Sequence, residues 1–236
     1  MEVTQFNRSE MILGRDSTEK LSNKKVIIFG LGGVGSYVAE AIARAGVGYI
    51  TIVDNDIVSE TNINRQLCAL HSTVGLNKTD VIAKRIADIN PACKVTPINR
   101  FYSAENSDDF NLTDYDYIAD AIDSVSSKLH LAELAYENNI KIISCMGTGN
   151  KLDPTLFRVS DISKTENCPL CRVMRYELKK RNIKHLTVVW SPETPLKPLE
   201  SNEEISKRAV PGSVPFVPGV AGLIMAGKII TDLNKD

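Results

Sequence analysis

Long apolar runs and internal repeats are both missing from this sequence. Its longest apolar stretches have the length of a strand, and its first ten residues, MEVTQFNRSE, are polar. The sequence therefore predicts neither a membrane-spanning helix nor a signal peptide, and we expect a cytoplasmic protein. The 236 residues, 43% of them hydrophobic, are enough to form the core of one α/β domain.

Cysteine is too sparse to organise the fold. The five cysteines are odd in number and scattered, which argues against the disulfide framework of a secreted protein; they are Cys68, Cys93, Cys145, Cys168 and Cys171. The last two form one C-x-x-C pair, and because no cysteine follows it, one chain cannot supply both pairs of a four-thiolate zinc site. Two thiols at the start of a helix are the favoured interpretation. A metal site, which two chains could share, is the alternative.

Positive charge is not in excess either, because 28 basic and 29 acidic residues give a net charge of −1. Contact with nucleic acid would therefore need a local basic patch. Residues 172–184, a predicted helix and its end, form such a patch with only one acidic residue, Glu177. Its basic residues are Arg172, Arg175, Lys179, Lys180, Arg181 and Lys184. They can neutralise several phosphates, whereas a solvated helix face is the alternative interpretation.

The most informative stretch runs from residue 24 to 56. A short β-branched run at 26–29 predicts a buried strand. The glycines that follow it have a G-x-G-x-x-G spacing with one extra member; they are Gly30, Gly32, Gly33 and Gly35. Such a turn lets the backbone approach a phosphate at the start of the next helix. A second strand ends in Asp54, where this pattern places a carboxylate for a ribose hydroxyl, so we expect a nucleotide to bind here.

The residues after Asp54 indicate which nucleotide binds. The glycine spacing alone would also fit a nicotinamide-dependent reductase, which needs no cations that reach phosphates. An adenylating enzyme does need them, since it must neutralise a triphosphate and stabilise charge at the α-phosphorus. The polar groups suited to this task are Asn62, Asn64, Arg65, Gln66 and Lys78. For Lys78, an ordinary lysine at the start of a helix is the alternative.

The combined motifs GxGGxG, DxD (Asp54 and Asp56), NxNRQ, VGxxK and NP resemble the ubiquitin-activating-enzyme-like superfamily, the adenylating fold of ThiF, MoeB and HesA. The resemblance implies that Asp54 binds the ribose of ATP, that Arg65 and Lys78 contact its phosphates, and that Asn62 lies close by. It also implies a homodimer, in which Arg8 reaches the phosphates of the neighbouring subunit. An exposed surface arginine is the alternative for Arg8.

Alternating strands and helices support the same architecture: α/β, with a Rossmann-like, doubly wound, mostly parallel sheet and helices on both faces. We expect strands at 26–29, 49–53, 94–98, 117–121 and 140–145, helices at 36–45, 77–89, 125–137 and 212–233, and a weakly helical segment at 103–110. The last helix looks too short and interrupted for a membrane span and is expected to pack on the sheet or at a dimer interface. Residues 201–209 are expected to form a loop. We expect one domain, made of an arm (1–24), a nucleotide-binding half (25–150) and a substrate-side half (151–236).

Asp120 and Asp123 fall where one of the predicted strands ends. The family resemblance implies that Asp123, in a D-x-x-D-[NS] motif, holds the Mg²⁺ that accompanies ATP. One or two protein carboxylates are enough for a cation that bridges phosphates. A turn and a helix cap are the alternative.

Motifs in the second half, among them DPT, SPE, FVP and AGL, resemble one branch of the superfamily, the tRNA threonylcarbamoyladenosine dehydratases. The resemblance implies that ATP activates the threonyl carboxylate of the modified nucleoside and that the ring then closes with loss of water. This chemistry needs no enzyme nucleophile, which suits a chain without an evident acceptor cysteine. Adenylation of a ubiquitin-like sulfur carrier is the alternative. A monovalent cation (Na⁺ or K⁺) and sulfur-transfer proteins are further candidate partners.

Overall fold

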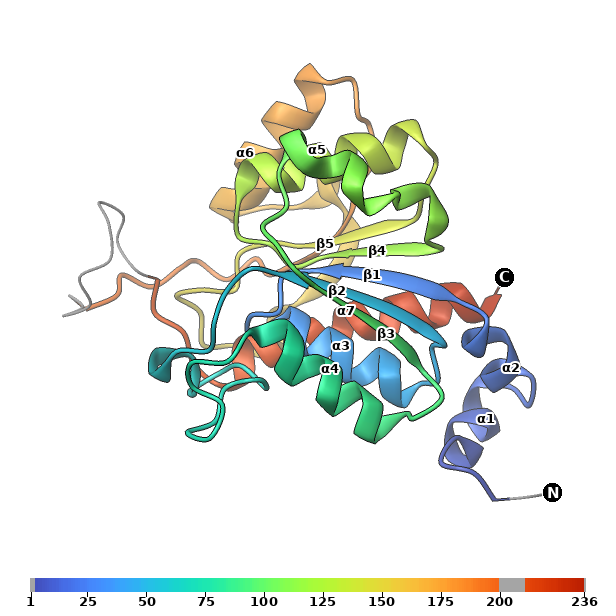
Figure 1. Cartoon of the computed structure of the whole chain (residues 1–236). Coiled ribbons are helices and arrows are strands. Elements are labelled where there is room, and N and C mark those ends of the chain that lie inside the picture. Colours follow the sequence, from blue (N-terminus) through green and yellow to red (C-terminus); the bar gives the residue numbers. More distant parts are fainter. Residues whose placement is uncertain (1–2, 200–210, 236) are drawn as a thin grey trace.

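One mixed sheet of seven strands forms the centre of the molecule. The computed structural model describes residues 3–199 and 211–235, and its sheet has the strand order β3-β2-β1-β4-β5-β7-β6 (Figure 1). Neighbouring strands are parallel except β6, which is antiparallel to β7. The strands are β1 (Lys25–Phe29), β2 (Tyr49–Asp54), β3 (Lys94–Asn99), β4 (Tyr117–Asp120), β5 (Ile142–Cys145), β6 (Arg158–Asp161) and β7 (Thr187–Trp190). The doubly wound, mostly parallel sheet expected from the sequence is confirmed.

Helices cover both faces of the sheet. Helices α3, α4 and α7 lie on one face, and α5 and α6 lie on the other (Figure 1). The α-helices are α1 (Asn7–Leu13), α2 (Ser17–Ser22), α3 (Gly35–Arg44), α4 (Lys78–Ile89), α5 (Val125–Glu137), α6 (Pro169–Lys180) and α7 (Phe216–Lys235). The described residues also form five short 3-10 helices: η1 (Glu60–Asn62), η2 (Ala104–Phe110), η3 (Leu112–Asp114), η4 (Pro154–Leu156) and η5 (Ile162–Lys164).

The sequence explains why α3 forms and where it packs. Its residues Val38, Ala39 and Ile42 recur at helical spacing and are fully buried. They belong to the hydrophobic core that α3 shares with β1, β2, α4 and α7. The helix therefore begins directly behind the glycine turn and is held firmly against the sheet.

Helix α7 corrects one expectation. It is a continuous helix of 20 residues, so by length and composition alone it could cross a membrane, and half of that apolar stretch is buried inside the molecule. Its glycines permit close packing and do not interrupt it, because a methyl group on Gly222 would lie 2.4 Å from the Val34 carbonyl oxygen. As expected, α7 packs on α3 and the sheet, and its first turn lies beside the glycine turn: Pro218 contacts Gly33.

The described part of the chain after residue 150 contains more structure than the sequence predicted. The two strands β6 and β7 extend the sheet past β5. Although α6 lies between them in the chain, β6 pairs antiparallel to β7, which departs from the parallel pairing that a strand–helix alternation predicts. The segment after Ser103 forms the 3-10 helix η2, which opens with a capping box between Ser103 and Asn106. The loop expected at 201–209 lies outside the described residues.

Candidate active site

The glycine turn lies against the end of the neighbouring strand β4. Gly30 has a φ of 87°, and a methyl group on it would come within 2.6 Å of the Ala121 carbonyl oxygen. A methyl group on Gly35 would lie 1.8 Å from the Gly30 carbonyl oxygen, so the turn can close only without side chains. The ends of β1 and β4 are thus brought together where the strand order reverses, which is where parallel α/β sheets bind ligands.

Asp54, the predicted ribose ligand, fixes this turn. Its Oδ2 accepts a hydrogen bond from the Leu31 N–H at 2.6 Å, and its Oδ1 accepts one from the Asp56 N–H at 2.8 Å. Burial raises the pKa of Asp54, although the charge of Lys78 and the two N–H groups oppose this effect. The carboxylate is half-buried and oriented, with lone pairs left for a hydroxyl group.

The NxNRQ segment packs directly on the glycine turn. A methyl group on Gly33 would lie 3.5 Å from Arg65 Cγ, and one on Gly32 would lie 3.9 Å from Gln66 Nε2. The guanidinium of Arg65 donates to the Thr61 carbonyl at 2.9 Å and to Asn64 Oδ1 at 2.8 Å. Arg65 is therefore placed beside the turn and is held by its own segment through neutral acceptors, which a phosphate can replace.

The side chain of Asn62 has a structural role in this segment. Its Oδ1 accepts from the Ser59 N–H at 3.2 Å and completes the capping box of η1. The amide of Asn64 donates to the Ser213 carbonyl at 3.0 Å, which ties the segment to the residues before α7. Both asparagines thus shape the loop that carries Arg65.

Lys78 does not fit an ordinary solvent-exposed lysine. Its side chain is only 5% exposed, and its Nζ lies 2.7 Å from Asp56 Oδ2, whose own side chain is 59% exposed. The Lys78 N–H also donates to the Asp56 carbonyl at 3.1 Å, which joins the start of α4 to the end of β2. The ammonium is thus brought to the nucleotide end of the sheet, paired with a carboxylate that faces solvent.

The two aspartates at the end of β4 differ sharply in environment. Asp123 is exposed, and within the part of the chain that the structure describes its carboxylate has no hydrogen-bond or ion-pair partner. The helix-cap alternative for Asp123 is wrong, because Ser124 is the N-cap of α5 and accepts from the Ser127 N–H. Asp120 is fully buried and forms an ion pair with the buried Lys128, at 3.1 Å.

Sequence reasoning missed Lys128, which also donates to Ser144 Oγ at 3.2 Å and to the Cys145 carbonyl at 2.8 Å. A signal was present: Lys128 lies four and seven residues before Ala132 and Ala135, on the buried face of α5. A basic residue at that position needs a buried partner, and Asp120 is available at the adjacent strand end.

Arg8 is not brought together with this site. It is exposed on α1, which lies at the opposite end of the sheet from the glycine turn (Figure 1). Phe6, two residues before it, contacts Gly46 between α3 and β2, at the amino ends of the strands. Arg8 therefore cannot serve the nucleotide site of its own chain.

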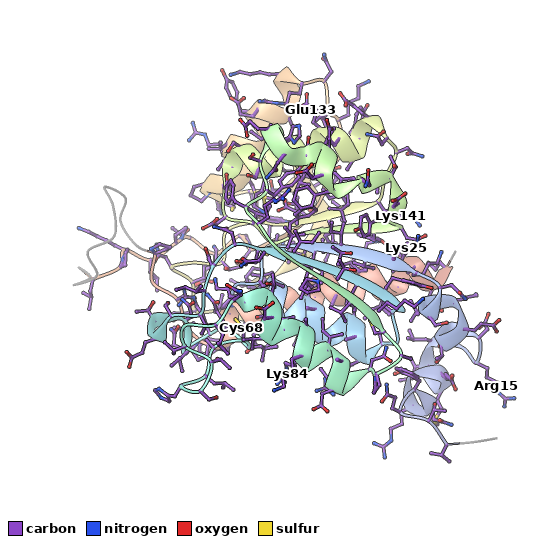
Figure 2. The ribbon with its side chains drawn as sticks, viewed as in Figure 1. Arg15, Lys25, Cys68, Lys84, Glu133 and Lys141 are labelled. Atoms are coloured by element: carbon purple, nitrogen blue, oxygen red, sulfur yellow. The ribbon has the colours of Figure 1, made fainter. Side chains whose placement is uncertain are left out.

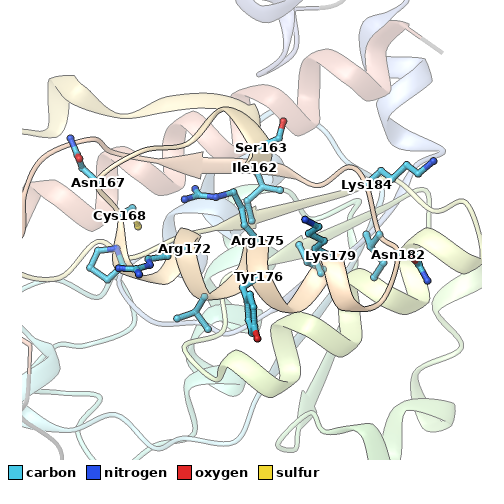
Figure 3. A pocket seen from close by; sticks show the side chains of 14 residues that line it. Ile162, Ser163, Asn167, Cys168, Arg172, Arg175, Tyr176, Lys179, Asn182 and Lys184 are labelled. Carbon is cyan, nitrogen blue, oxygen red and sulfur yellow. The ribbon is translucent and has the colours of Figure 1, made fainter.

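The predicted basic helix is α6, and a pocket of about 1410 Å³ runs along it (Figure 3). The pocket is lined by the basic residues Arg172, Arg175, Lys179 and Lys184 and by the exposed Tyr176. The six basic residues are not equally available, however. Arg175 donates to the Thr165 carbonyl at 2.9 Å, and Lys180 and Arg181 pair with Glu177 at 3.0 and 2.9 Å. Arg172, Lys179 and Lys184 have no such partner among the described residues and face the pocket.

Comparisons with known proteins agree with this geometry. The model of the ThiF family matches residues 6–236. The tRNA threonylcarbamoyladenosine dehydratase of Bacillus subtilis is 46% identical over 98% of this chain and 95% of its own length. That of Escherichia coli is 40% identical over 74% of this chain and 65% of its own length.

Solved structures show the same relationship. The crystal structure of the E. coli tRNA N6-threonylcarbamoyladenosine dehydratase in complex with ATP superposes with a TM-score of 0.88 at 32% identity, and the match covers 97% of this chain and 93% of that one. The sequence and the fold thus agree over almost the whole length, and the chain belongs to the ThiF family, in the branch of the tRNA threonylcarbamoyladenosine dehydratases.

Proposed function

We propose that this protein uses ATP to dehydrate threonylcarbamoyladenosine in tRNA to its cyclic form. The observation that carries the proposal is the convergence of Asp54, Arg65 and Lys78 around the glycine turn, in a chain that matches a B. subtilis enzyme of this name over nearly its full length. ATP is the substrate that makes the reaction feasible, because a carboxylate has a poor leaving group and an acyl-adenylate has a good one.

Three side chains would each contact a different part of ATP. Asp54 accepts from the ribose hydroxyls, since its orientation is already fixed by two N–H groups. Arg65 leaves its neutral carbonyl acceptors for the phosphates, and Lys78 offsets the charge that develops when pyrophosphate leaves. Asp56, which holds Lys78 from the solvent side, keeps that ammonium pointed at the end of the sheet.

Asp123 is the residue that would hold Mg²⁺. Its carboxylate is exposed at the carboxyl end of β4 and has no partner in the described part of the chain, as an oxygen ligand for a hydrated cation requires. Asp120 does not fit this role, because Lys128 neutralises it in the interior. A bound Mg²⁺ would supply charge neutralisation on the ATP phosphates.

After activation, ring closure is intramolecular. The carbamoyl group of the substrate attacks its own activated carboxyl carbon, AMP leaves, and water is lost overall. Positioning supplies much of the rate of such a step. No cysteine is needed as an acceptor, and all five are buried.

A homodimer would add a residue of the second subunit to the nucleotide site. In a homodimer, α1 of one subunit would bring Arg8 to the phosphates of the other, a role that α1 cannot play within its own chain. Exposed apolar residues on α1, Met11 at 85% and Ile12 at 88%, are consistent with a partner there.

The groove along α6 would bind the tRNA backbone through Arg172, Lys179 and Lys184, the three cations without a partner among residues 3–199 and 211–235. Tyr176 is 62% exposed at the groove and lies under Lys180, with the ammonium 4.2 Å from the ring centre. Three cations in a row can neutralise phosphates of one strand without making the whole molecule basic.

The test is a reaction with purified protein, ATP, Mg²⁺ and tRNA that carries threonylcarbamoyladenosine. We expect a nucleoside lighter by one water in the mass spectrum, together with AMP and pyrophosphate. An unchanged nucleoside, with AMP formed only when a ubiquitin-like carrier protein is added, would favour the carrier-activating alternative. Quenching of NADH fluorescence without ATP binding would favour a reductase.

Two sets of variants test the nucleotide site and the groove along α6 separately. Arg65→Ala should reduce product formation by about a hundredfold or more and leave tRNA affinity intact. Lys179→Ala with Lys184→Ala should leave ATP affinity intact and reduce the salt slope of tRNA binding by about 1 to 2. Lys84→Ala with Lys94→Ala is the matched control, since it removes the same charge elsewhere: Lys84, on α4, lies on the opposite side of the molecule from Glu133 on α5 (Figure 2). An equal effect of both double variants would contradict a specific groove.

A further inference from the structure

The C-x-x-C pair occupies the start of α6. Cys168 is the N-cap residue and Cys171 is the third residue of the helix. Residues three apart in an α-helix have Cα atoms about 5 Å apart, which falls within the range of about 4.4–6.8 Å that a disulfide can bridge. Both side chains are buried in one cluster, at 3% and 0% exposure. The backbone thus already holds two free thiols at disulfide spacing.

The surroundings of Cys168 stabilise a thiolate. The thiol of Cys171 and the backbone N–H groups of Cys171 and Gly147 are the donors that favour its ionised sulfur. These groups, with the charge of Lys151, lower the pKa of Cys168 well below that of an ordinary thiol, against the effect of burial. A thiolate with such donors, at the positive end of a helix, is the reactive form of cysteine.

Lys151 provides an independent indication of negative charge at this position. It is 3% exposed, and its Nζ donates to the Glu193 carbonyl. Within the described ranges it has no carboxylate partner, because the Glu193 carboxylate accepts from the N–H groups of Leu152 and Asp153. An unpaired ammonium in the interior is costly, so a nearby thiolate would provide its missing counter-charge.

Cys171 has the complementary environment. Its thiol hydrogen-bonds the Cys168 sulfur, and this contact and burial raise the pKa of Cys171 above its ordinary value. The side chain of Thr165 partly offsets this rise; its hydroxyl donates to the Ile162 carbonyl at 2.7 Å and accepts from the Arg175 guanidinium. Cys168 lines the groove along α6 whereas Cys171 does not, so Cys168, although only 3% exposed, is the cysteine that borders the groove (Figure 3).

We propose that Cys168 and Cys171 form a redox-active dithiol that exchanges with small-molecule disulfides entering through the groove along α6. The Cys168 thiolate attacks one sulfur of a disulfide RSSR, the S–S bond breaks, and RS⁻ leaves with the proton of Cys171 as RSH. The Cys171 sulfur then attacks Cys168 Sγ and breaks the mixed disulfide, and the second RS⁻ takes a proton from water. The protein loses two electrons, and RSSR is reduced to two RSH.

The other three cysteines serve as internal comparators. Cys68, Cys93 and Cys145 are buried, and burial raises the pKa of each, to about 11, about 11 and about 12. Their thiols should therefore remain free under conditions in which Cys168 reacts.

The test incubates the reduced, folded chain with glutathione disulfide, quenches it with acid and measures its mass before and after alkylation. We expect loss of two hydrogens, with a peptide map that joins Cys168 to Cys171. Cys171→Ser should trap one glutathione on Cys168, whereas Cys168→Ser should take up none. Between pH 8.5 and 6.5 the rate should fall less than threefold, whereas a thiol with the ordinary pKa of about 8.5 would slow about fiftyfold. Lys151→Met should steepen this dependence.

Three results would overturn the proposal. One is a folded chain that keeps five free thiols while the urea-unfolded chain oxidises. Another is a glutathione adduct on Cys68, Cys93 or Cys145 in place of Cys168. The third is zinc that copurifies with the chain and protects both thiols until a chelator removes it. None of these readouts depends on adenylation or on tRNA, so the proposed function can fail or hold independently.

Discussion

The ion pair between Asp120 and Lys128 should be the most sensitive single feature of the fold. Both side chains are buried, at 0% and 1% exposure, and the Lys128 ammonium contacts both Asp120 oxygens, at 3.1 and 3.2 Å, the Ser144 hydroxyl at 3.2 Å and the Cys145 carbonyl at 2.8 Å. In Lys128→Met, Asp120 keeps only the Ser144 hydroxyl at 2.5 Å and the Ile122 N–H at 3.2 Å. Its charge would then stay in the interior without a counter-charge.

The expected loss follows from this geometry. Removing one partner of a buried pair costs about 3–5 kcal/mol, a large share of a domain stability of about 5–15 kcal/mol. Combining Lys128→Met with Asp120→Asn removes both charges and leaves a neutral amide beside Ser144. The double variant should therefore be less destabilised than Lys128→Met alone, although it carries one more substitution.

Urea unfolding followed by fluorescence and circular dichroism measures both quantities, and an unchanged slope would confirm that only stability has changed. Lys84→Met, at an exposed position of α4, is the control and should change the free energy of unfolding by no more than about 0.5 kcal/mol. The reasoning is refuted if Lys128→Met costs less than about 1 kcal/mol, or if the double variant loses the sum of the two single losses.

Two further changes test local features. Burial alone would raise the pKa of Glu40, but hydrogen bonds from Arg85 and Arg44 lower it. The ionised form of Glu40 therefore stabilises the fold above the unfolded pKa of about 4.3. This stabilisation is lost as the pH falls through the lower pKa of the folded state. Glu40→Gln should therefore cost about 1 kcal/mol or less at pH 7, a difference that vanishes near pH 3 in urea titrations and that would persist there if packing were its cause. Gly35→Ala should abolish ATP binding in calorimetry, because its methyl group would meet the Gly30 carbonyl at 1.8 Å, whereas Gly227→Ala, with open space around it, should bind ATP normally. Equal ATP affinity for both alanine variants would contradict the tight turn.

Much of the fold could be predicted from the sequence because each strand and helix of the first half carries its own local pattern. The buried run of β1, the glycine turn and the amphipathic α3 and α4 were all expected within a few residues of their bounds. The strands β6 and β7 were missed, since they become strands by long-range pairing: β7 pairs with both β5 and β6. The continuity of α7 was missed for a related reason: its glycines look like interruptions until the close approach of Gly222 to Val34 is visible.

The candidate site shows a similar division. The sequence indicated which side chains carry charge near the turn, but not which are already paired. Half of the basic residues predicted on α6 have intramolecular partners. One of these partners, Glu133, belongs to α5, and its carboxylate lies 3.8 Å from the Arg181 guanidinium. Such a contact depends on how two helices pack on the sheet, which no local pattern in either helix specifies.

Asp120 and Asp123 show why burial decides function when residue type does not. The two carboxylates are three residues apart at the end of β4, and from residue type and position alone either of them could face a ligand. The parallel sheet places the last residue of β4 between β1 and β5, where it loses all exposure and must take its counter-charge from α5. Three residues later the chain has left the sheet and Asp123 is exposed. The metal-binding role proposed for Asp123 would therefore depend on Lys128: with Asp120 neutralised, Asp123 is the carboxylate at this end of β4 that has no counter-charge among the described residues.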